Sequence, residues 1–237
     1  MLQQYRIADL LVAYDAQYPM LRVRSEKYGT YVPGPTHLLT ASAERIASAR
    51  EKTPLLTDEE REYMLIGGDF YRLLTAQDGL MLHASAVVVD EKAYLFSASS
   101  GTGKSTHTAL WLEYFGKDAY ILNDDKPAIR ILPDGVFAYG TPFSGKYDIS
   151  VDRRVPIGGI AFLQRDAKNE LTPLPQKEAI YHLLNQTLRP RETQLYTKLL
   201  ATIERLTEQA AIYTLRCTIS REAVETAYNG MRKGTTK

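Results

Sequence analysis

The stretch Ala98-Ser99-Ser100-Gly101-Thr102-Gly103-Lys104-Ser105-Thr106 decides the fold expected for this chain of 237 residues. It combines glycines, which let backbone amides approach a polyphosphate, with a lysine for its charge and a hydroxyl for Mg²⁺. The usual pattern of such loops would place glycine at position 98. Alanine stands there instead, and it would disfavour a positive φ if the turn required one. We expect residues 99–106 to bind a nucleoside triphosphate.

The residues around this loop provide the context that a nucleotide loop needs. Residues 93–96 are apolar and predict a buried strand before the loop, and residues 103–114 predict a helix after it. A strand expected at residues 119–122 completes a strand, loop, helix, strand unit of about 30 residues. Such a unit is typical of a mostly parallel or mixed sheet. A glycine-rich turn of this pattern should arise by chance on the order of once in a hundred such chains.

The rest of the chain predicts an α/β fold preceded by a smaller part. Alternating residues at 5–12 and 20–23 suit antiparallel strands, and Thr57 followed by Glu60 has capping-box spacing before a helix over residues 57–76. Further strands are expected at 80–89, 128–132, 136–139, 158–163 and 211–216, and helices at 176–184, 192–208 and 221–231. We expect residues 1–78 to form a small N-terminal α+β subdomain and residues 79–237 the nucleotide-binding domain.

A pair of carboxylates follows the strand expected at residues 119–122. Mg²⁺ is a hard cation that prefers carboxylate and hydroxyl oxygens, so Asp124, Asp125 and Ser105 are candidate metal ligands. Phosphoryl transfer also needs a positioned nucleophile, so one aspartate would hold the metal while the other accepts the proton of the substrate hydroxyl. The residues leave open which aspartate does which. On their own, they would be interpreted as a solvated turn.

The overall charge limits the class of partner. The chain has 29 basic and 28 acidic residues, which leaves no broad attraction to nucleic acid or to an anionic membrane. No stretch approaches the ~20 apolar residues that span a bilayer. Arg6 and Asp9 interrupt the first apolar stretch, unlike a signal peptide. We expect a cytoplasmic protein that binds neither nucleic acid nor membranes.

Four segments, in their order along the chain, resemble the HPr kinase/phosphorylase family, whose nucleotide domain is related to phosphoenolpyruvate carboxykinase. They are Leu82-His83-Ala84-Ser85-Ala86-Val87, residues 99–106, Asn123-Asp124-Asp125 and Gly140-Thr141-Pro142-Phe143-Ser144-Gly145-Lys146. The resemblance covers residues 80–163. It implies a P-loop nucleotide domain of this type with a mixed sheet, and a kinase that uses ATP and Mg²⁺.

The resemblance also implies roles for particular side chains. His83 would face the active site from the strand before the loop and tune the proton on Asp124. The loop motif by itself predicts that Lys104 neutralises the β and γ phosphates. Lys146, with Arg153 and Arg154, would add positive charge to the transferred group. On residue chemistry alone, His83 would be a core residue and the two arginines ordinary surface charges. His107 is expected to point into the structure.

The expected function is transfer of the γ-phosphoryl group of ATP to a serine-type hydroxyl of a protein or peptide. HPr kinases have a larger N-terminal domain and a C-terminal signature that this chain lacks, and the chain is closer to the shorter HPr-kinase-like proteins. Self-association is expected by analogy with hexameric HPr kinases. The alternatives are a kinase of a small hydroxyl-bearing molecule, favoured by an enclosed pocket, and a non-catalytic nucleotide-binding regulator.

Overall fold

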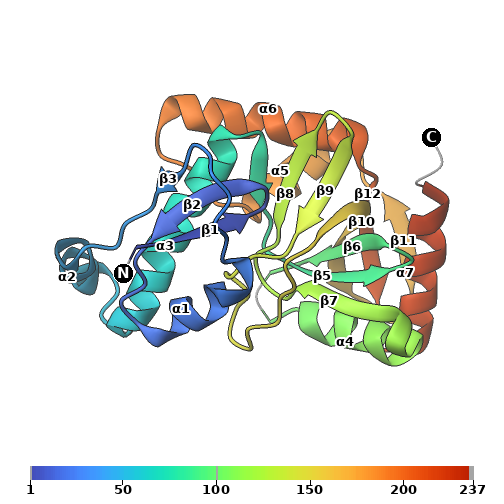
Figure 1. Cartoon of the computed structure of the whole chain (residues 1–237). Helices are drawn as coiled ribbons and strands as arrows, with labels where there is room; N and C mark the ends of the chain where they lie inside the picture. The colour runs from blue at the N-terminus through green and yellow to red at the C-terminus, as the bar shows by residue number, and fades with distance from the viewer. Residues whose placement is uncertain (1, 100, 235–237) are drawn as a thin grey trace.

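A computed structural model describes residues 2–99 and 101–234 of the chain, which fold into a mixed α/β structure (Figure 1). Its strands are β1 (Gln3–Ile7), β2 (Leu10–Tyr14), β3 (His37–Leu38), β4 (Gly79–Met81), β5 (Ala84–Val89), β6 (Lys92–Ser97), β7 (Ala119–Asn123), β8 (Ala128–Leu132), β9 (Gly135–Tyr139), β10 (Arg154–Arg165), β11 (Glu170–Pro173) and β12 (Ile212–Cys217). Its helices are α1 (Pro19–Ser25), α2 (Ala43–Lys52), α3 (Asp58–Ala76), α4 (Lys104–Phe115), α5 (Gln176–Asn185), α6 (Thr193–Gln209) and α7 (Arg221–Gly234), with short 3₁₀ turns η1 (Glu26–Tyr28) and η2 (Gly116–Asp118).

One curled mixed sheet positions the glycine loop. Its strand order is β4-β8-β9-β10-β6-β5-β7, and β12 with β11 joins it at β10. β10 is parallel to β6 and β12, whereas β5 is antiparallel to both of its neighbours, β6 and β7. The carboxyl ends of β6 and β7 therefore lie beside the amino end of β5. This arrangement brings the glycine loop, the aspartate pair and His83 together at the same ends of these three strands.

Helices cover both faces of this sheet (Figure 1). Because successive strand residues point to opposite faces, Val88 and Leu95 pack in the core under α5 and α6. Val87 and Phe96 pack on the other face, in the core that contains Trp111 of α4 and residues of α7. The phosphate-loop strand β6 thus lies between two apolar layers, which fix where its carboxyl end emerges.

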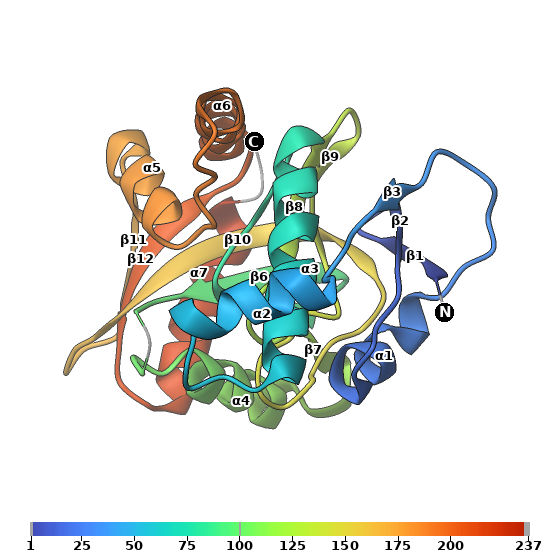
Figure 2. The same cartoon turned by 90° about the vertical axis from the view of Figure 1, so that its left-hand side faces the viewer.

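The N-terminal part shares its core with the main sheet. Its small sheet has the order β1-β2-β3, and α2 crosses the long helix α3 in front of the main sheet (Figure 2). Phe70 and Leu74 of α3 belong to one buried cluster with Ala128, Tyr139 and Phe143. The boundary expected between residues 78 and 79 falls between α3 and β4, and the apolar core continues across it. None of the helices in the described residues has the length and apolar character to cross a membrane.

Most predicted elements are confirmed, including the capping box of Thr57 and Glu60 at the start of α3. The strand predicted at residues 20–23 is wrong, because Pro19 at the first helical position begins α1 there. The strand predicted at residues 5–12 is a hairpin, β1 and β2, whose turn at Ala8 and Asp9 has positive φ.

The single strand predicted at residues 80–89 is two strands with different partners. β4 pairs with β8 at one edge of the sheet, whereas β5 pairs with β6 and β7 near the other edge. The chain changes direction at Leu82-His83, where the amide of His83 donates to the carbonyl of Gln186 at 2.7 Å. The expectation of a single strand overlooked the polar His83 at the break, because apolar residues lie on both sides of it.

The helix after the loop contains a buried histidine. The Nε2 atom of His107 accepts a hydrogen bond from Trp111 Nε1 at 3.1 Å, and its ring meets the edge of Phe96. Burial lowers the pKa of His107 to about 4. The expectation that His107 points into the structure is confirmed.

The histidine makes folding stability depend on pH. In the unfolded chain His107 takes up a proton below about pH 6.5, whereas the folded protein resists protonation until pH is near 4. The neutral His107 therefore contributes roughly 3 kcal/mol to the free energy of unfolding above pH 6.5, and this contribution is lost as pH falls toward 4. We predict that His107→Gln, which keeps an acceptor for Trp111, removes most of this loss in denaturant titrations at pH 7 and pH 4.5. His37→Gln, at an exposed position, is the matched control, and an equal pH dependence in both variants would contradict the prediction.

Candidate functional site

The glycine loop leads from β6 directly into α4. Among the described residues of this loop, positive φ occurs only at Gly101 (76°) and Gly103 (118°). Ala98 is buried, and its backbone does not need the conformation that glycine would allow. Gly103 precedes the first turn of α4, whose amides have no partner within the helix and face the loop. Ser100, expected to belong to the loop, lies outside the described residues.

Two basic side chains hold the loop. Lys104 donates from Nζ to the carbonyl of Ala98 at 3.1 Å. Burial lowers the pKa of Lys104, although Asp125 and Asp124 act in the opposite direction. Arg165, at the end of β10, donates to the carbonyl oxygens of Gly101 at 2.7 Å and Thr102 at 3.1 Å. We did not predict Arg165 from the sequence, because its position depends on the parallel pairing of β10 with β6.

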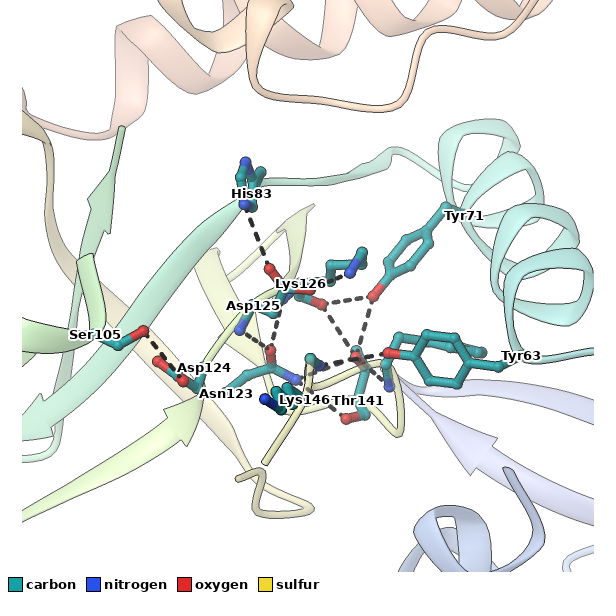
Figure 3. Close-up of polar contacts among 12 residues, drawn as sticks. Tyr63, Tyr71, His83, Ser105, Asn123, Asp124, Asp125, Lys126, Thr141 and Lys146 are labelled. Carbon is teal, nitrogen blue, oxygen red and sulfur yellow. Dashed lines mark hydrogen bonds and ion pairs between the residues drawn. The ribbon is translucent and has the colours of Figure 1, made fainter. Parts of the chain in front are cut away.

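The turn after β7 is shaped by a buried amide side chain. Oδ1 of Asn123 accepts from the backbone amides of Asp125 at 3.0 Å and Lys126 at 2.8 Å. Its Nδ2 donates to the carbonyl of Thr141 at 3.1 Å. The turn is therefore tied to the segment that begins at Gly140, and its two carboxylates diverge (Figure 3).

Asp124 points toward the glycine loop. Ser105 Oγ donates to its Oδ2 at 3.3 Å, and Ser85 Oγ donates to its Oδ1 at 2.7 Å. Ser85 is buried and also contacts the Thr108 hydroxyl at 2.9 Å. The structure thus brings together Ser105 and Asp124, two of the predicted metal ligands. Ser85 was missed as a site residue, although a serine inside an apolar buried strand is a usable signal.

Asp125 points to the opposite side of the turn. Its carboxylate lies 3.4 Å from Nε2 of His83 and forms an ion pair with Lys126 (Figure 3). Burial raises the pKa of Asp125, but the hydrogen bond from His83 and the charge of Lys126 outweigh it and lower that pKa to about 2. Nδ1 of His83 lies 3.1 Å from Gln186 Oε1, which orients the ring. His83 therefore contacts Asp125 and not Asp124, the residue it was expected to tune.

The predicted Gly-Lys loop lies against the same turn. Gly145 has φ of 76°, and a Cβ there would stand 2.8 Å from Cβ of Asp125. Lys146 follows with an exposed side chain, 5.7 Å from the Tyr147 ring centre. Arg24 of α1 donates to the Lys146 carbonyl at 3.5 Å, so the N-terminal part supports this loop.

The two predicted arginines are held elsewhere. Arg153 contacts Glu91 at 3.3 Å, and Glu91 lies in the turn before β6, at the end opposite the glycine loop. Arg154 forms an ion pair with Asp134, in the turn after β8, and lies over the Phe137 ring. The structure therefore does not bring Arg153 and Arg154 together with the loop and the aspartates.

These contacts define an α/β protein with a glycine loop at a helix N-terminus and two divergent carboxylates beside it. A family model described as "SynChlorMet cassette protein ScmC" matches residues 64–227, more than half of the chain. The chain belongs to this family. A solved structure of the Hpr(Ser) kinase/phosphatase from Coxiella burnetii aligns with 66% of this chain and 99% of that chain, at 14% sequence identity and a TM-score of 0.37. None of the curated proteins compared with the chain matches it in sequence.

The central position of Asn123 leads to a stability prediction. Asn123→Ala should lower the free energy of unfolding by about 2 kcal/mol, because it leaves two partly buried amides of the turn and the buried carbonyl of Thr141 without their partner. Denaturant titration measures this change. The control is Asn229→Ala on the exposed face of α7, where a change within ~0.5 kcal/mol is expected. An equally small effect at Asn123 would show that the turn does not depend on its side chain.

Proposed function

We propose that the protein is an ATP- and Mg²⁺-dependent kinase that phosphorylates a serine-type hydroxyl of a protein or peptide. The observation that carries the proposal is the 3.3 Å hydrogen bond from Ser105, in the first turn of α4, to Asp124 after β7. Asp125 is the next residue and points the other way. One side of the turn is thereby suited to a metal and phosphates, and the other side to an acceptor. Lys104 supplies the charge that neutralises the β and γ phosphates.

The residues fit a bound Mg²⁺. Ser105 and Asp124 offer a hydroxyl and a carboxylate, both hard oxygen donors, and Mg²⁺ is usually held by one or two protein groups together with substrate phosphates and water. Within residues 2–99 and 101–234, no cluster of three or more His, Cys, Asp or Glu side chains forms a closed metal site. When bound, the ion would neutralise charge on the β and γ phosphates.

Asp125 is the group proposed to receive the acceptor. In the reaction the bond from the γ phosphorus to the ADP oxygen breaks, a bond to the acceptor oxygen forms, and the hydroxyl proton passes by way of the Asp125 carboxylate to solvent water. Because the pKa of Asp125 is about 2, its carboxylate stays ionised and can accept the hydrogen bond that orients the hydroxyl. His83 and Lys126 hold the carboxylate in place.

Substitution of Asp124 should act mainly on the metal. We predict that Asp124→Asn raises the Mg²⁺ concentration needed for nucleotide binding about tenfold, equivalent to ~1.4 kcal/mol. Titration of a fluorescent ATP analogue at several Mg²⁺ concentrations measures this. Asp118→Asn, on exposed η2, is the control. An unchanged Mg²⁺ requirement in Asp124→Asn would rule out the metal role.

Substitution of Asp125 should act mainly on transfer. We predict that Asp125→Asn retains nucleotide affinity but slows phosphoryl transfer by about 10²-fold to 10⁴-fold, because the acceptor hydroxyl loses its hydrogen-bond partner. Single-turnover transfer from γ-labelled ATP separates the two quantities. If both aspartate variants transferred phosphate at the wild-type rate, the roles assigned to the turn would be wrong.

The function itself is tested by incubation with γ-labelled ATP and Mg²⁺ against cell extract separated into protein and small-molecule fractions. Label in protein that disappears in Lys104→Met supports the proposal. Label in the small-molecule fraction would instead identify a small-molecule kinase. Nucleotide binding without label in either fraction would favour a regulator.

A further inference from the structure

A cavity of about 240 Å³ lies next to the turn that carries the aspartates. Its wall is mostly apolar and includes the rings of Tyr63 and Tyr71 from α3 and of Phe143 from the loop after β9. The Phe143 ring centre lies 5.5 Å from that of Tyr63 and 5.5 Å from that of Tyr71. The three rings therefore form one packed wall and not a set of independent side chains.

The cavity is connected to Asp125 by direct contacts. Lys126 lines the cavity and is ion-paired with Asp125. Tyr71 donates from its hydroxyl to the Lys126 carbonyl at 2.5 Å, and the Tyr63 hydroxyl accepts from the amide of Gly145 at 3.4 Å. Both tyrosines extend from α3 toward the turn (Figure 3). A group held in the cavity would thus lie next to the carboxylate proposed to orient the acceptor.

Two adjacent glycines of α3 line the cavity, and only one of them is explained by packing. A Cβ on Gly67 would lie 2.9 Å from the Phe143 ring, so a side chain there would displace that ring. A Cβ on Gly68 would meet nothing within 4 Å. Glycine inside a helix costs about 1 kcal/mol relative to alanine. Packing does not require glycine at position 68, but glycine there keeps this part of the cavity free of a side chain.

We propose that this cavity receives an aromatic side chain of the acceptor peptide, near the serine that is phosphorylated. This inference rests on the kinase function proposed above. An apolar cavity of ~150 Å³ holds a benzene ring, so the volume here suits a phenylalanine, tyrosine or tryptophan side chain. Three rings in the wall favour an aromatic guest, because offset and edge contacts between rings add to the burial of apolar area.

The rim of the cavity favours a peptide over an isolated small molecule. Met64 and Leu188 stand at the opening with 39% and 38% of their surface exposed. Apolar area therefore continues from the cavity onto the protein surface, where flanking residues of a chain could lie. An enclosed pocket, which would favour a small molecule, is not what these residues form.

Binding to the cavity can be measured without nucleotide. Met64 and Met81 line the cavity. Met231 belongs to α7 and is buried against β10. With methyl-labelled methionine, titration of N-acetyl-tryptophanamide should shift the NMR signals of Met64 and Met81 saturably and leave that of Met231 in place. Gly68→Leu should abolish these shifts, while Gly68→Ala should retain them. Absent shifts, or shifts that persist in Gly68→Leu, would overturn the proposal.

The link to the acceptor is tested with a library of serine peptides that carries each amino acid in turn at every position around the serine. With γ-labelled ATP, the wild type should prefer aromatic residues at one fixed position by about tenfold to a hundredfold over alanine. Gly68→Leu should lose this preference and Gly68→Ala should keep it. Both substitutions favour helix, so thermal unfolding should show no destabilisation.

The outcomes separate the two proposals. Phosphorylation of the library with no aromatic preference, or with a preference that Gly68→Leu retains, would overturn the cavity as acceptor site and leave the kinase intact. A library that the nucleotide-bound wild type does not phosphorylate at all would overturn the peptide-kinase function, and the acceptor role of the cavity with it.

Discussion

The side chain of Asn123 is the contact on which the candidate site depends. It accepts two amides of the turn after β7 and donates to Thr141, so one buried group fixes the turn and the segment that leads to Gly145. With the turn fixed, consecutive residues diverge. Asp124 faces Ser105, and Asp125 faces His83 and Lys126. Two adjacent carboxylates can thereby serve different partners, which a flexible acidic turn could not do.

Sequence reasoning located the parts of the site that local patterns specify. The glycine loop, the helix after it and the acidic end of β7 follow from motif and periodicity. The structure brings Lys104, Ser105, Asp124, Asp125 and His83 together at the carboxyl ends of β6 and β7 and the amino end of β5. Sequence reasoning could not locate groups whose place depends on strand pairing. Arg165 reaches the loop only because β10 is parallel to β6. Arg154 begins β10 and Arg153 comes directly before it, so both lie at the end of the strand away from the loop.

The N-terminal part was expected to be a separate subdomain, and its relation to the rest could not be obtained from sequence. The apolar face of α3 shows that the helix is buried, but periodicity does not say against which partner. In the structure that face packs on Tyr139 and Phe143, and Arg24 of α1 supports the loop at Lys146. Residues before the nucleotide domain therefore help to shape the side of the site opposite the glycine loop.

The long strand β10 joins three groups of strands that are otherwise separate. Its first residues pair with β9, its middle with β6, and its last residues with β12 and hence β11. Opening the sheet at β10 would break all three connections at once, whereas β4 or β11 at the edges can separate with little cost to the rest. In hydrogen exchange, the amides of Ile160, Ala161 and Phe162 should then report global unfolding, while edge strands exchange through local fluctuations.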